Sequence, residues 1–234
     1  MNWTYVQVNA LEVLTWTCVQ LFDGRVTTRM PVAERRAQLV DAAMAIATDE
    51  GVPAITVRRV AERAGVALGV VHYCFADKDE LFGALAARIV DDLSGAAAAA
   101  LDVDGAVGLG EALHAAVLGS WALIERTPGE QLLTYEITTT ALRTSGLRGV
   151  ALRQYAASQA AIERLLTLAA DAAAAGWDRP VAEVAGEALA FLDGVTLRWL
   201  ADGDGPAARA RLAAFVDYLA TQATVRRRRR KALP

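Results

Sequence analysis

Several side chains in residues 56–78 can donate hydrogen bonds. They offer hydroxyl, guanidinium, imidazole, phenol and ammonium groups, all of which can bind an anionic ligand such as phosphate; they belong to Thr56, Arg58, His72, Tyr73 and Lys78. The chain shows no Ser-His-Asp order, paired carboxylate site, nucleotide-binding loop or metal-ligand spacing. These residues therefore indicate noncovalent recognition and not catalysis, and we expect neither a metal ion nor another cofactor.

The elements that position these side chains are expected to be two short helices joined by a tight turn. Thr56 is a suitable N-cap for the first helix, which runs to Ala64 with apolar residues at helical spacing. Gly65 follows at the place where a helix ends in the left-handed conformation that glycine adopts cheaply. A turn at residues 66–67 then leads to a second helix at residues 68–74. This is a helix-turn-helix, whose second helix has the right size for the major groove of DNA.

Residues 32–81 resemble the DNA-binding domain of the TetR family of one-component bacterial transcriptional regulators. The resemblance rests on a long first helix closed by Gly51, the segment ITVRRVAERAGV, the Tyr73-x-Phe75 pair and Lys78, in the family's order and spacing. An ordinary three-helix bundle is the alternative, but a pattern of apolar and polar residues alone would not produce Tyr-x-Phe followed by lysine at these offsets. The resemblance implies an all-α homodimer with an N-terminal three-helix DNA-binding domain and a C-terminal helical domain for ligand binding and dimerisation.

The resemblance also implies which side chains would contact double-stranded DNA. Thr56 and Tyr73 would donate hydrogen bonds to phosphates, and Arg58 would contact a phosphate or a base. Backbone N–H groups at the start of the helix that follows Thr56 favour an anion in the same place. Lys78 would begin the next helix close to the sugar–phosphate backbone.

The second helix departs from the family pattern in two ways. The turn position that is commonly serine is Ala67, which removes an N-cap worth about 1 kcal/mol and one phosphate contact. In addition, residues 67–73 contain no Arg or Lys. Base recognition is then left to apolar contacts from Ala67 or Leu68 and to close approach at Gly69. His72 could hydrogen-bond to a base, or equally to a phosphate, so we expect modest affinity for each half-site.

The composition favours helices throughout. Alanine and leucine are abundant, and runs of β-branched residues are few. No apolar run reaches the roughly 18 residues that a membrane helix needs without a charge or a helix breaker, so no membrane is expected as a partner. Cys18 and Cys74 have neither zinc-ligand spacing nor a disulfide pattern, which suits a reduced cytoplasmic setting. We expect helices at residues 79–100, 111–126, 129–143, 147–176, 179–201 and 205–222.

The net charge of −3 is distributed unevenly along the chain. Residues 226–231 contribute +6, so the remainder carries −9, and residues 30–80 hold six basic against eight acidic residues. One copy of the DNA-binding domain should therefore hold DNA weakly without sequence preference, and two copies on a two-fold axis would be needed. The basic segment could steer the protein to DNA or could be a solvated terminus. A DNA-organising protein that needs no ligand and has weak sequence preference is the alternative function.

The chain divides into four segments in this interpretation. Residues 1–29 are expected to be a disordered extension before a natural start at Met30, or else an arm through which Arg25 and Arg29 reach DNA. A secretion signal is not expected, because the first residues lack positive charge and no small-x-small cleavage site follows. The other segments are the DNA-binding domain, the ligand-binding and dimerisation domain and a basic tail, at residues 30–80, 81–222 and 223–234.

The second domain should enclose a pocket with an apolar wall and a few polar groups. The unusual run YEITTT supplies hydroxyls to a helix in an otherwise apolar domain, although these threonines could equally hydrogen-bond to their own helix. The segments ALRTSGLRGVALRQY and FLDGVTLRWL resemble the C-terminal domain of betaine-responsive regulators. The candidate ligand-binding residues are Trp121, Tyr135, Glu136, Thr138, Thr139, Leu142 and Tyr155.

The last two helices should form the dimer interface that the resemblance implies, a bundle of four helices from two chains. Their apolar stripe could also be the core of a single chain. A two-fold dimer implies a palindromic operator, and the function expected is that of a repressor released by a small apolar or amphipathic effector. The candidate interface residues are Val184, Ala188, Phe191, Val195, Leu212, Phe215 and Leu219.

Overall fold

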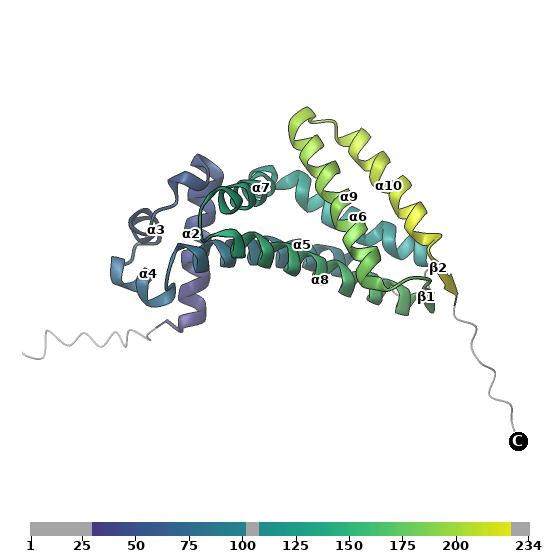
Figure 1. Ribbon diagram of the computed structural model, residues 1–234, viewed down its shortest axis with the longest axis horizontal. Helices are drawn as coiled ribbons and strands as arrows, with labels where there is room; N and C mark the ends of the chain where they lie inside the picture. Colours follow the sequence, from purple (N-terminus) through teal and green to yellow (C-terminus); the bar gives the residue numbers. More distant parts are fainter. Residues whose placement is uncertain (1–29, 102–107, 226–234) are drawn as a thin grey trace, which may run out of the picture.

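The computed structural model describes residues 30–101 and 108–225, which form an elongated and almost wholly helical molecule (Figure 1). The expectations for residues 1–29 and for the basic segment at 226–231 lie outside the described residues. The all-α prediction is confirmed. No helix in the two described ranges combines the length and the apolar character that are needed to cross a membrane.

The N-terminal end of the molecule, which we call the headpiece (residues 30–77), consists of three α-helices and one 3-10 turn. Thr56 caps the second of these α-helices by accepting a hydrogen bond from the N–H of Arg59 at 3.2 Å, and Gly65 ends it with φ 67°, as its sequence predicts. The elements are α2 (Val32–Glu50), η1 (Val52–Ala54), α3 (Val57–Ala64) and α4 (Leu68–Cys74).

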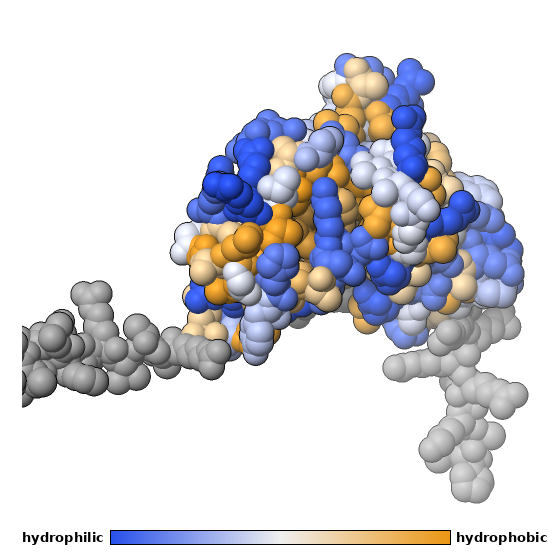
Figure 2. Space-filling view, turned by 60° about the vertical axis from the view of Figure 1, so that its left-hand side comes forward, coloured by the Kyte–Doolittle hydropathy of each residue, from blue (hydrophilic) through white to orange (hydrophobic). Residues whose placement is uncertain are grey.

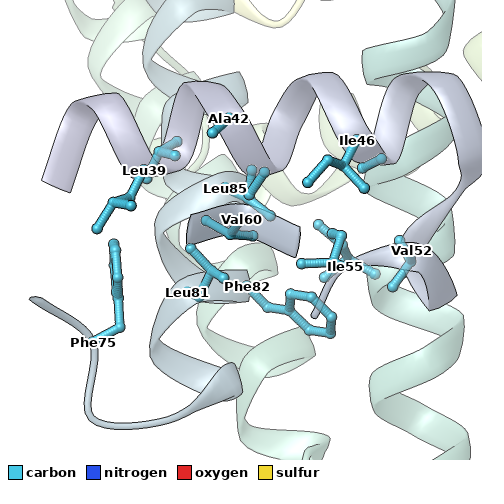
Figure 3. Close-up of a cluster of buried hydrophobic side chains, with 14 of the residues drawn as sticks. Leu39, Ala42, Ile46, Val52, Ile55, Val60, Phe75, Leu81, Phe82 and Leu85 are labelled. Atoms are coloured by element: carbon cyan, nitrogen blue, oxygen red, sulfur yellow. The ribbon is translucent and has the colours of Figure 1, made fainter. Parts of the chain in front are cut away.

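The core of the headpiece continues into the helix that follows it. Figure 3 shows Leu39 and Ile46 of α2 opposite Leu81 and Leu85, which belong to α5 (Lys78–Leu101). Asp77 begins α5 by accepting a hydrogen bond from the N–H of Glu80 at 2.8 Å. Because this apolar cluster includes residues before and after position 80, the packing has no break at the domain boundary expected there.

The second part of the molecule consists of six packed helices, of which α5 runs from the headpiece toward the opposite end (Figure 1). One of them, α7, contacts α2 and η1 of the headpiece as well as α8 and α9. After α5 the helices are α6 (Leu109–Arg126), α7 (Pro128–Arg143), α8 (Arg148–Ala172), α9 (Val181–Asp202) and α10 (Gly205–Ala220).

Two expectations near the C-terminus are wrong. The helix expected at 147–176 ends at Ala172, and Ala174 has a φ of 49°, which turns the chain into the short strand β1 (Ala175–Trp177). Residues assigned to the tail form β2 (Ala223–Val225), antiparallel to β1. The Trp177 indole N–H donates to the carbonyl of Leu166 at 3.2 Å and ties this strand to α8. The two strands are far apart in sequence, so their pairing depends on tertiary packing and cannot be predicted from local helix preference.

Candidate DNA-binding face and ligand cavity

Every residue that was expected to contact DNA is exposed, either on the α3–turn–α4 unit of the headpiece or at the start of α5. Tyr73 is 71% exposed and Leu68 47% exposed, whereas Val60 of α3 and Val71 of α4 are buried. A side chain added at Gly69 would meet nothing within 4 Å, so the surface in front of α4 is open. Figure 2, turned to bring this end forward, shows hydrophilic and apolar residues intermingled on this side. The exposed set is Thr56, Arg58, Ala67, Leu68, Gly69, His72, Tyr73 and Lys78.

The arginines of α3 are paired with acidic residues at the surface. Arg58 donates to Glu62 at 2.9 Å across one helical turn, and its side chain is 84% exposed. Arg59 forms an ion pair with Glu50 at the end of α2. The hydrogen bond to Glu62 is the main reason why the pKa of Arg58 is raised. An exposed pair of this kind contributes little to stability, so Arg58 can exchange its partner for a phosphate at small cost.

Arg36 of α2, which the sequence did not indicate, fixes the end of the recognition helix α4. Its guanidinium lies 4.3 Å from the centre of the Phe75 ring, donates to the carbonyl of Cys74 and donates to Glu80 at 2.7 Å. Glu80 also accepts from the N–H of Ala76 at 2.8 Å. That backbone hydrogen bond, followed by the one from Arg36, lowers the pKa of Glu80. Through these contacts Glu80 connects α2, the end of α4 and the start of α5.

A cavity of about 190 Å³ lies between helices α5 to α10. Its wall is mainly apolar and includes Leu93, Ile162, Leu192 and Phe215. Polar groups interrupt this wall at a few places, as a ligand pocket requires. The polar side chains that line it are Ser94, Ser120, Gln131, Thr134, Tyr135, Ser158, Asp193 and Thr196.

Two of the seven expected ligand-binding residues, Trp121 and Tyr135, line the cavity. A third, Tyr155, lies beside it and donates its hydroxyl to Asp193 at 2.9 Å. Trp121 is almost fully buried, its indole N–H donates to Glu125 at 2.9 Å, and its ring meets Trp199 edge to face.

The other four expected ligand-binding residues have different positions. The hydroxyls of Thr138 and Thr139 donate to carbonyls of α7 itself, because a threonine in a helix can reach the preceding turn. Leu142 is 54% exposed on the surface. Glu136 points to the headpiece, where its carboxylate accepts the N–H of Val52 at 2.9 Å. The expectation that these four side chains line the pocket is wrong.

Asp193 of α9 is the acidic residue of the cavity wall, and no pattern in the sequence singled it out. Two tyrosines surround it: Tyr155 donates to Oδ2 at 2.9 Å, and the Tyr135 hydroxyl lies 3.1 Å from its backbone oxygen and 3.5 Å from Oδ1. Burial raises the pKa of the Asp193 carboxyl, and the two tyrosine hydrogen bonds oppose this shift. Burial also raises the pKa of Tyr155 to about 12 and that of Tyr135 further, so both phenols stay protonated donors.

Most of the expected dimer residues lie inside a single chain. Their burial in one chain means that they cannot form a surface for a partner, because α9 and α10 use this stripe to pack on α6 and α8. Phe191 and Phe215 are partly buried and stack with ring centres 4.0 Å apart. The buried ones are Val184, Ala188, Val195, Leu212 and Leu219.

The opposite faces of α9 and α10 are exposed and carry mostly small residues. The two helices lie side by side at the end of the molecule away from the headpiece (Figure 1). Leu197 and Tyr218 are about half exposed, at 51% and 47%. We call this surface the outer face; its residues are Ala190, Gly194, Leu197, Ala201, Ala210, Ala214 and Tyr218.

Comparisons with known proteins agree with this architecture. Residues 39–85 match the family model described as bacterial regulatory proteins, tetR family. The chain is 29% identical over 180 residues to the HTH-type nicotine-responsive transcriptional repressor HdnoR of Paenarthrobacter nicotinovorans, covering 76% of this chain and 90% of that protein. It superposes with a TM-score of 0.68 and 23% identity on the crystal structure of a putative TetR-family transcriptional regulator from Rhodococcus sp., covering 80% of this chain and 98% of that one.

A third relative bears on the resemblance to betaine-responsive regulators. The HTH-type transcriptional regulator BetI of Burkholderia cenocepacia (strain HI2424) is 41% identical, but only over 59 residues, which are 25% of this chain and 30% of that protein. So short a match is no more than a weak indication for the C-terminal domain. The helix-turn-helix headpiece, the helical second domain and the three kinds of match agree: residues 39–85 form a DNA-binding domain of the tetR family of bacterial regulatory proteins, and the chain as a whole is similar to regulators of that family.

Proposed function

We propose that the protein is a cytoplasmic transcriptional repressor that binds a palindromic operator as a homodimer and is released when a small effector enters the cavity. The observation that carries this proposal is the position of α7. This helix lines the cavity with Gln131, Thr134 and Tyr135, while the next residue, Glu136, binds the backbone of the headpiece at Val52. A change at the cavity wall can therefore reach the DNA-binding face through one rigid element.

The exposed set on α3, α4 and the start of α5 supports DNA binding in two roles. Thr56, Arg58, Tyr73 and Lys78 offer donors suited to phosphates, and the open surface at Gly69 allows α4 to approach base edges. The pairing of the α3 arginines with carboxylates limits the non-specific attraction of one headpiece. Specific binding then depends on two headpieces that contact two half-sites together.

The outer face supports the dimer. Its small side chains allow the backbones of α9 and α10 to approach the same helices of a second chain, with Leu197 and Tyr218 as the large apolar contacts. Because α9 and α10 lie away from the headpiece, a two-fold dimer built on this face would leave both headpieces free to contact DNA (Figure 1).

Release by an effector follows from differential affinity. A ligand that binds more tightly to a conformer with the wrong headpiece spacing shifts the population toward that conformer and weakens operator binding. The relative with 29% identity is by its name a repressor that responds to nicotine, a small organic molecule, which supports this kind of response.

The test is selection of bound fragments from genomic DNA by the purified full-length protein at near-physiological salt. Enrichment of a sharp palindrome in a few promoters, lost in a Tyr73→Phe, Lys78→Gln double variant, is the expected result. Diffuse enrichment that collapses as salt rises would instead identify a DNA-organising protein with weak sequence preference, and would contradict the operator-specific function.

A further inference from the structure

We propose that the effector is a small organic cation whose positive charge lies against the carboxylate of Asp193. This inference rests on the proposed function of the cavity as the effector site and adds the chemical class of the ligand. It depends on the charge of the wall, on the tyrosines that hold the carboxylate, on an unpaired amide and on the volume of the cavity.

The charged side chain in the described wall of the cavity is acidic. Asp193 is the one carboxylic acid among the described residues that line it, and none of those residues is Lys, Arg or His. Within the described ranges no basic side chain forms an ion pair with Asp193 either. A half-buried carboxylate without a counter-ion is costly, and a bound cation would remove that cost. An anionic ligand would meet repulsion here and would find no basic partner.

The surrounding aromatic groups favour a cation as well. The Tyr155 and Tyr135 hydroxyls direct their hydrogen bonds to Asp193, which keeps the carboxylate oriented and opposes its protonation. Tyr135, Trp121 and Phe215 also line the cavity. Aromatic rings attract organic cations through their negative faces, so the same wall stabilises the charge and the apolar body of such a ligand.

Gln131 provides a second polar anchor on the same face of α7 as Tyr135. It is 5% exposed and lines the cavity, and its side-chain amide forms no hydrogen bond with any residue of the described ranges. Its amide atoms are not among the side-chain atoms that are fully enclosed without a partner, so a ligand in the cavity can reach them and complete their hydrogen bonds. A matching ligand would therefore carry one hydrogen-bonding group in addition to its cationic centre.

The volume restricts the size of the ligand. An engineered cavity of about 150 Å³ in another protein accommodates benzene, so about 190 Å³ suits one ring with a short substituent. Benzyltrimethylammonium is a suitable probe, because it combines a ring with a permanent charge. Neopentylbenzene has the same shape with carbon in place of the charged nitrogen, and so isolates the contribution of charge.

The experiment measures binding of both probes to the full-length wild-type protein and to two variants by isothermal titration. Asp193→Asn removes the carboxylate, and Glu183→Gln removes an exposed carboxylate from the same helix as a matched control. We expect the wild type to bind the cation at least tenfold more tightly than its isostere. Asp193→Asn should abolish that preference and leave isostere binding unchanged, and Glu183→Gln should retain it.

A second measurement does not depend on any variant. Because the probe carries a permanent charge, its affinity for the wild type should fall as the pH drops through the raised pKa of Asp193, while that of the isostere stays constant. Tyr135 and Tyr155, the titratable groups that face this carboxylate from α7 and α8, remain protonated throughout.

Three results would overturn the cationic class: equal affinity for the two probes, failure of the wild type to bind the cation, or an undiminished preference in a folded Asp193→Asn protein. Operator binding by the same preparations is measured separately. Intact operator binding without a cation preference would reject only this inference, whereas absent operator binding would reject the proposed regulator.

Discussion

The carboxylate of Glu136 accepts a hydrogen bond from the backbone N–H of Val52 at 2.9 Å, and this contact joins α7 to the headpiece between α2 and α3. Gly51 lies against the same carboxylate: a Cβ at this position would approach Glu136 Oε2 to 3.3 Å, and its φ of 82° already favours glycine. Adjacent residues of a helix point about 100° apart, so Tyr135 and Glu136 contact two different sites from neighbouring positions.

The first prediction concerns this connection. Glu136→Ala leaves the Val52 N–H without its acceptor, so the headpiece should follow α7 less closely. We expect the ratio of operator dissociation constants with and without effector to shrink several-fold, a loss within the range of about 1–3 kcal/mol typical of allosteric coupling. Effector affinity in the absence of DNA should change little. Thr139→Ala, on the exposed side of α7, is the control, and an unchanged ratio in Glu136→Ala would show that the signal takes another route.

The second prediction concerns two glycines with opposite surroundings. A Cβ at Gly119 of α6 would lie 2.8 Å from both the Cβ of Ala100 and the backbone oxygen of Ala96 on α5, whereas a Cβ at Gly95 meets nothing within 4 Å. Gly119→Ala should therefore separate α5 from α6 and destabilise the protein by about 1–3 kcal/mol. Gly95→Ala should stabilise it by about 0.5–1 kcal/mol through helix preference. Urea denaturation measures both, and equal effects of the two changes would refute the close approach of these helices.

The third prediction concerns Arg58, which is paired with Glu62 in the free protein. If Arg58 exchanges this partner for a phosphate, Arg58→Gln should weaken operator binding. It should also make the slope of log affinity against log salt shallower by about 0.9 for each phosphate that the protein no longer neutralises. Arg164→Gln, an exposed arginine of α8, serves as the control. A reduced affinity confined to one base position, with the salt slope intact, would assign Arg58 to base recognition instead.

The fourth prediction concerns Glu80, whose pKa is lowered from 4.5 by the Ala76 N–H first and by Arg36 next. A carboxyl with a lowered pKa in the folded state contributes stability above its unfolded pKa and loses it as the pH falls through the folded value. The wild type should therefore lose stability as the pH falls from about 4.5, and Glu80→Gln should lose less over the same window. Thermal unfolding between pH 6 and pH 3 measures the difference, and parallel curves would contradict this role.

The headpiece could be predicted well from the sequence because its signals are local. Thr56 and Gly65, which mark the two ends of α3, can be recognised from the residues next to the helix. The exposure of Tyr73 follows from its spacing from the buried residues of α4. The cavity was predicted only in part, because Asp193 and Gln131 converge from α9 and α7 through packing that no short pattern encodes. The same reason explains the errors at Glu136 and at the strand pair.

The last prediction separates stability from function at Asp193. Burial raises the pKa of this carboxyl in the folded state. A carboxyl whose pKa is raised by folding costs no stability below its unfolded pKa, where it is protonated in both states. As the pH rises through the folded pKa, the free energy of unfolding falls. Asp193→Asn should therefore gain stability relative to the wild type as the pH increases from 4 to 7, although it loses the preference for a cation. Such a gain is expected where a protein retains an unfavourable charge for binding. Urea denaturation of the variant and the wild type at both pH values measures the gain. If the stability of the variant relative to the wild type is instead lower at pH 7 than at pH 4, the two tyrosine hydrogen bonds make Asp193 a structural residue.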